Sequence, residues 1–154
     1  MQIISFNYFF ASITAYIGLL AGIILIKIAP EEQKPGKKYF ILLKKILFFL
    51  ILASLLFFYK IHIAISLILL FFIIVLMANE KIKLDKSAPV YLLLGIAFYL
   101  SSKITDLFVA VPVLIFLYGL PTASLIINPK KINYYDIFAR NLWFFVPVVA
   151  LYFI

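Results

Sequence analysis

The chain has 154 residues, 67% of them hydrophobic, and its mean hydropathy is +1.20. Soluble domains are only about half apolar, so a soluble fold of this length could not bury so much apolar surface, and we expect an all-α polytopic membrane protein. The formal net charge is +8, but the basic residues flank apolar segments, which argues against a nucleic-acid partner. The absence of Cys excludes disulfides and thiolate chemistry.

The first apolar segment, residues 8–28, is expected to cross a membrane as a retained helix. No Lys or Arg occurs among residues 1–26, whereas a cleavable signal peptide places its positive charges before the apolar core. At about 1.5 Å per residue, the segment matches the roughly 30 Å thickness of the hydrocarbon layer.

Small residues line one face of this first helix. They follow one another at intervals of four, three and four positions: Ala11, Ala15, Gly18 and Gly22. A face of this kind lets two membrane helices approach closely. We expect a helix-packing seam here, which either closes the protein's own bundle or receives a second copy or another membrane protein.

The longest polar interruption in the chain follows, at residues 29–45, and the second span, residues 39–59, begins inside it. Four lysines cluster in its second half: Lys37, Lys38, Lys44 and Lys45. Residues seven apart share a helical face, so we expect the lysine stems to reach back to the headgroups. The cluster then contacts anionic lipid headgroups, or it serves only to orient the chain.

Residues 46–78 contain no Gly, Pro or Asn. As a single helix they would be about 50 Å long, which exceeds the bilayer thickness. We therefore expect a hairpin at Tyr59–His62, with the third span at residues 63–78, although no turn-forming residue stands there. His62, the only His, either pairs with an acidic group and senses pH or reaches the headgroups as a turn residue.

Three further spans are expected in the second half of the chain. A polar stretch at residues 79–87 precedes the fourth span, residues 89–101. The fifth span covers residues 107–127 and contains two prolines, and the sixth covers residues 135–154.

A kink is expected in the fifth span at Pro121, because this proline frees the carbonyl of Leu117 from the helix. Thr122 and Ser124 are near enough to bond to the freed backbone. Two arrangements remain open. These four residues either line a water-filled path, or neighbouring helices pack the kink dry.

The distribution of positive charge predicts the orientation. With residues 29–45 in the cytoplasm, only Lys60 and Lys103 of the fourteen basic residues fall outside, which indicates six spans with both termini outside. The cytoplasmic set is Lys27, Lys34, Lys37, Lys38, Lys44, Lys45, Lys81, Lys83, Lys86, Lys130, Lys131 and Arg140. We expect the cytoplasmic membrane of a bacterium or archaeon.

No motif for catalysis, metal or cofactor binding is present, and of the six acidic residues only Asp136, at the start of the sixth, lies within an expected span. We therefore expect a protein that is not an enzyme and holds no cofactor. The first hypothesis is a structural or accessory subunit of a membrane complex that uses the small-residue face of the first helix. The alternative is a small oligomeric transporter or channel with the kinked fifth helix along its path. A lipid-processing enzyme is the least favoured.

Overall fold

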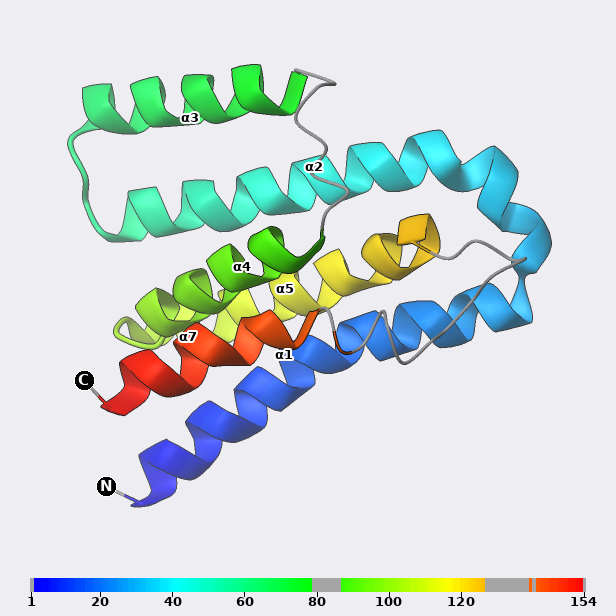
Figure 1. Cartoon of the computed structure of the whole chain (residues 1–154). Coiled ribbons are helices and arrows are strands. Elements are labelled where there is room, and N and C mark those ends of the chain that lie inside the picture. The colour runs from blue at the N-terminus through cyan, green and yellow to red at the C-terminus, as the bar shows by residue number, and fades with distance from the viewer. Residues whose placement is uncertain (1, 79–86, 127–138, 140, 154) are drawn as a thin grey trace.

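The computed structural model describes residues 2–78, 87–126, 139 and 141–153, and the regular elements in this part of the chain are helices (Figure 1). The all-α expectation is thus confirmed for these residues. The elements are α1 (Gln2–Ile28), the 3-10 helix η1 (Pro30–Glu32), α2 (Gln33–Phe58), α3 (Ile63–Ala78), α4 (Ser87–Ser101), α5 (Thr105–Ile126), the 3-10 helix η2 (Leu142–Phe144), α7 (Phe145–Ala150) and the 3-10 helix η3 (Leu151–Phe153).

Within the described residues, three helices are long and apolar enough to cross a membrane: Phe6–Ile28, Pro35–Phe58 and Thr105–Leu125. Three shorter apolar helices are Ile63–Val75, Pro89–Ser101 and Leu142–Phe153. Six of the basic residues counted above lie outside the described residues: Lys81, Lys83, Lys86, Lys130, Lys131 and Arg140.

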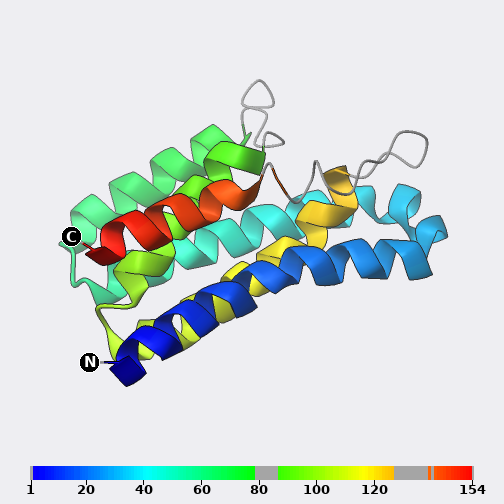
Figure 2. The same cartoon turned by 60° about the horizontal axis from the view of Figure 1, so that its bottom comes forward.

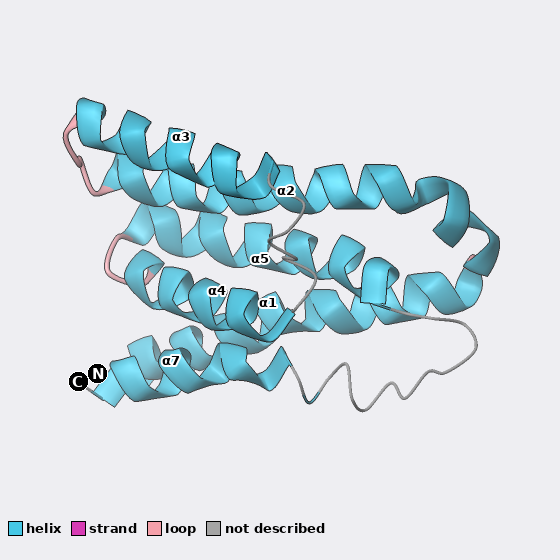
Figure 3. Ribbon diagram, turned by 45° about the horizontal axis from the view of Figure 1, so that its top comes forward, coloured by secondary structure: helices cyan, strands magenta, loops and turns pink. Residues whose placement is uncertain are grey.

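The helices run up and down along one common direction. α5 packs on both α1 and α2, α7 packs beside α4, and α3 packs on α2 (Figures 1 and 2). α1 begins and η3 ends at the same end of the bundle, where the α2–α3 and α4–α5 turns also lie (Figure 3). Consecutive helices are therefore antiparallel neighbours or near neighbours, as short connections favour.

The chain turns between α2 and α3 at the predicted position, with Lys60 in the left-handed conformation at φ 51°. The Lys60 N–H donates to the Phe57 carbonyl at 3.1 Å, and the Ile61 N–H donates to the Leu56 carbonyl at 3.3 Å. This pair of bonds is the Schellman motif, in which Gly usually occupies the left-handed position. Lys60 occupies that position here, so the turn forms although no turn-forming residue stands in the sequence.

His62 begins α3. Its Nδ1 accepts a hydrogen bond from the Ala64 N–H at 3.4 Å, and its carbonyl accepts one from the Ser66 N–H at 3.0 Å. The imidazole therefore partly satisfies a donor at the helix N-terminus, which has no partner within the helix. This position of His62 fits the expected role of a turn residue better than that of a pH sensor.

The small-residue face of α1 packs against α5 of the same chain. A Cβ atom added to Gly18 would collide with the Phe116 carbonyl, and one added to Gly119 would collide with the backbone of α1. One added to Gly22 would lie 2.7 Å from the Leu120 carbonyl oxygen. Ala15 is buried and Ala11 is half-buried along the same line. The two backbones are therefore in contact, and of the two expected uses of the seam, this is the intramolecular one.

The C-terminal helices are held by a second close approach. A Cβ atom on Gly95 of α4 would collide with the Phe144 carbonyl and lie 2.6 Å from the Pro147 side chain. The Tyr8 hydroxyl donates to the Val148 carbonyl at 2.9 Å, which ties α1 to α7. The expected sixth span is represented in the described residues by η2, α7 and η3 in succession.

The α1–α5 contact predicts that Gly18 tolerates no side chain. We expect Gly18→Ala to destabilise the folded protein in detergent by about 2 kcal/mol or more, because one backbone must move away from the other. Gly36→Ala is the matched control. A Cβ there meets only the movable Phe40 ring, and Ala is favoured over Gly in a helix by about 1 kcal/mol. Thermal unfolding of both variants is the measurement, and equal midpoints would contradict the backbone contact.

Candidate functional site

The four clustered lysines do not share one environment. Lys37 and Lys38 are exposed and Lys45 is half-buried, whereas Lys44 is only 6% exposed. Lys44 is buried because it precedes Phe48 by one helical turn and Ile51 by two, and both lie on the inward face of α2. The expectation that all four lysines face the lipid headgroups therefore needs correction at Lys44, which points into the bundle.

The Lys44 ammonium lies against an aromatic face. Its Nζ is 5.7 Å from the centroid of the buried Tyr118 ring on α5. A ring in this position attracts a cation through its quadrupole, and the attraction is stronger where water is excluded. The contact partly offsets the cost of placing an ammonium within an apolar bundle.

Two further tyrosines continue inward from Tyr118. The Tyr91 ring of α4 is 6.1 Å from the Tyr118 ring, and the Tyr16 ring of α1 is 6.3 Å from the Tyr91 ring, both edge-to-face. With Lys44 and Thr122, these tyrosines form a group that we call the polar cluster. Four helices contribute to it. Nothing in the sequence singles these tyrosines out, because the chain contains ten.

Tyr91 is the polar cluster's most constrained member. It is 1% exposed, and among the described residues its hydroxyl has no hydrogen-bond partner. The Thr122 hydroxyl lies beside it and donates its own hydrogen bond to the Tyr118 carbonyl at 2.8 Å. A buried hydroxyl without a partner costs about 1–3 kcal/mol, so the fold places a polar group here at some expense to its stability.

The residues expected to line a path at the α5 kink face different directions. Thr122 is fully buried, whereas Leu117 is 39% exposed on the outer side of α5. The Thr122 hydroxyl bonds to the carbonyl of Tyr118, and the Ser124 hydroxyl bonds to the carbonyl four positions earlier at 3.2 Å. Neither of these two bonds goes to the Leu117 carbonyl that Pro121 frees, so the expected bonding to the freed backbone is not seen. The full burial of Thr122 is the observation that favours the dry arrangement over the water-filled one.

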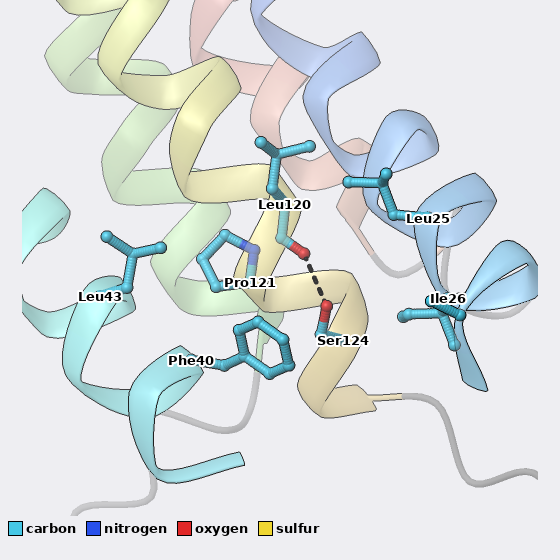
Figure 4. A pocket seen from close by; sticks show the side chains of 8 residues that line it. Leu25, Ile26, Phe40, Leu43, Leu120, Pro121 and Ser124 are labelled. Atoms are coloured by element: carbon cyan, nitrogen blue, oxygen red, sulfur yellow. Dashed lines mark hydrogen bonds between the residues drawn. The ribbon is translucent and has the colours of Figure 1, made fainter. Parts of the chain in front are cut away.

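An apolar cavity of about 280 Å³ lies beside Pro121, between the ends of α1, α2 and α5 (Figure 4). We call it the kink pocket. Its lining residues are Leu25, Ile26, Ala29, Phe40, Leu43, Leu120, Pro121 and Ser124. A cavity of this size and apolar character suits a hydrocarbon chain better than water or an ion.

A second apolar cavity, of about 350 Å³, lies toward the opposite end of the bundle. We call it the hairpin pocket, because the α2–α3 turn forms part of its wall. Its lining residues are Leu52, Leu55, Leu56, Tyr59, Ile61, Leu69, Ile73 and Leu100. The Tyr59 hydroxyl beside it donates to the Leu100 carbonyl at 2.9 Å and so links the turn to α4.

Comparison with known proteins adds no assignment to these features. No family model matches the chain, and no match was found among curated proteins or among solved structures. The candidate sites therefore consist of the polar cluster, the two pockets, and the exposed faces of the helices that surround them.

Proposed function

We propose that this protein spans a cytoplasmic membrane six times, with both termini outside, and acts as a non-enzymatic accessory subunit of a membrane complex. The antiparallel succession of helices supports six crossings. The shorter helices, such as α4 with 15 residues, are about 22 Å long. A membrane accommodates such a length by local thinning at modest cost.

The positions of the described charges support this orientation. The α2–α3 turn carries Lys60 and the α4–α5 turn carries Lys103, and both turns lie at the end where α1 begins. Lys27, Lys37 and Lys38 stand at the opposite end, where α1 ends and α2 begins. The more basic end is expected on the cytoplasmic side.

The proposed role as a subunit rests on α3. Among the described residues, α3 packs mainly on α2 (Figures 1 and 3). Large apolar side chains stand exposed around α3, with Ile68 at 67%, Phe71 at 69% and Phe72 at 57% exposure. α5 already packs on the small-residue face of α1. This face is therefore not available for the partner protein that the first hypothesis placed there. Within the part of the chain that the structure describes, α3 has no buried residue, and it is therefore the surface that we assign to a partner helix.

The orientation predicts a labelling pattern in intact cells. Single cysteines at Lys60 and Lys103 should react with a membrane-impermeant thiol reagent, and those at Lys37, Lys83 and Lys130 should react only after permeabilisation. The native chain has no Cys to interfere. Reaction at position 83 in intact cells would rule out the six-span orientation.

The partner surface predicts position-specific cross-linking in the native membrane. A photoreactive residue replacing Phe71 should yield one defined adduct with a different membrane protein, and Ile68→Ala should weaken it. The matched control replaces Ile24, which is 56% exposed on α1, and should yield no such adduct. Adducts of lipid alone from both positions would contradict the proposed role of α3.

A second function, a small transporter, is favoured by one observation. Lys44 lies within the span Pro35–Phe58 and is buried against Tyr118. Ionisable residues inside spans commonly mark the path of an ion or a proton. The α5 hydroxyls proposed as path-lining bond to their own helix, so Lys44, not the kink, is the group on which this alternative depends.

The transport alternative predicts a loss of flux on neutralising Lys44. Proteoliposomes containing the wild-type protein should conduct protons or small anions, Lys44→Met should abolish this flux, and Lys45→Met should retain it because Lys45 is only half-buried. Fluorescent reporters of internal pH and chloride provide the measurement. A folded wild-type protein that conducts neither would remove transport as a function.

A further inference from the structure

The kink pocket lies where three helices end together. α1 ends at Ile28, α2 begins at Gln33 and α5 ends at Ile126, and the pocket wall includes Ala29, which follows the last residue of α1. A pocket at helix ends is at the depth where the lipid headgroups meet their acyl chains. Its apolar wall is therefore within reach of the first part of an acyl chain in the same leaflet.

Positive charge stands at the rim of this pocket. Phe40 forms part of the pocket wall, and Lys37 precedes it by three positions, so the two residues share one face of α2. Lys37 and Lys38 are both exposed. Two acids, Glu31 and Glu32, lie in η1 between the two helices. Residues 29–38 carry three lysines and two glutamates, so this connection has a net charge of +1.

We propose that the kink pocket and the two rim lysines, Lys37 and Lys38, together bind an anionic phospholipid. One acyl chain lies against Phe40, Leu43 and Pro121, and the lipid phosphate lies at the lysine ammonium groups. The chemistry at each end is matched, because the pocket wall offers apolar carbon and the rim offers point charges suited to phosphate. This site is independent of any partner on α3 and of any flux through the bundle.

The hairpin pocket provides an internal comparison. It is similar in size and is also apolar, but the described basic residues at its end are Lys60 and Lys103, and the Lys103 Nζ stacks on the Tyr99 ring at 4.6 Å from the centroid. The rim there has no adjacent pair of exposed lysines. An apolar pocket alone would bind neutral and anionic lipids equally, so selectivity for anionic lipid is the property that distinguishes the kink pocket.

Lipid binding to the purified full-length chain in dodecyl maltoside tests this proposal. Dioleoyl phosphatidylglycerol and dioleoyl phosphatidylcholine are titrated separately, and native mass spectrometry and thermal unfolding report binding. Two lysines near a phosphate predict a preference for phosphatidylglycerol of about tenfold or more. The double variant Lys37→Gln with Lys38→Gln should lower this preference to about onefold, while phosphatidylcholine binding is unchanged. Leu43→Trp, which obstructs the pocket, should weaken the binding of both lipids.

Matched controls address the other end of the bundle. Lys60→Gln and Leu69→Trp at the hairpin pocket should leave the preference for phosphatidylglycerol unchanged. Equal binding of both lipids by the wild-type protein, or an undiminished preference in the double lysine variant, would overturn the proposal. An equal thermal shift with inorganic phosphate alone would also overturn it, since it would show that the acyl chain contributes nothing. The lysine variant lies on an exposed surface, so the test holds even if Leu43→Trp fails to fold.

Discussion

Close contact between the backbones of α1 and α5 is the constraint on which the remaining structure depends. Within a bilayer, lipid tails are as apolar as the helices, so association depends on the fit of surfaces and not on removal from water. Gly18 and Gly119 provide that fit from opposite sides, because a side chain at either position would meet the other backbone. With α1 and α5 held together, α2 and α4 pack on the remaining faces of α5 and enclose the interior.

Several polar side chains are buried in the enclosed interior among apolar ones. Lys44 and Thr122 lie among buried tyrosines, one of which, Tyr91, has a hydroxyl with no hydrogen-bond partner among the described residues. A core of Leu and Phe would be more stable, because an ammonium and a lone hydroxyl are costly away from water. A polar group retained at such a cost is more often functional than structural, which is why the transport alternative retains one specific argument.

α5 continues through Pro121 as one helix from Thr105 to Ile126. Hydroxyls at Thr122 and Ser124 bond to carbonyls of the same helix, while Pro121 itself faces a small apolar cavity. The space beside the proline is therefore lined mostly by apolar side chains. The same proline that suggested a path for solutes thus borders a recess suited to a lipid chain, and the proposed preference for anionic lipid depends on the lysines at the start of α2.

The sequence by itself located the described helices to within several residues, because their positions depend on local properties: the length of each apolar run, the polar breaks and the charges beside them. α1 and α2 each begin six residues before the expected spans. Even the turn at Lys60 was located by length and charge, although its left-handed backbone was not foreseen. The tertiary structure decided which way each helix faces. Lys44 turned inward away from Lys45, and Leu117 turned outward away from Thr122, because the rotation of a helix depends on neighbours distant in the chain. Nearly uniform apolarity leaves no polar face from which that rotation could be read.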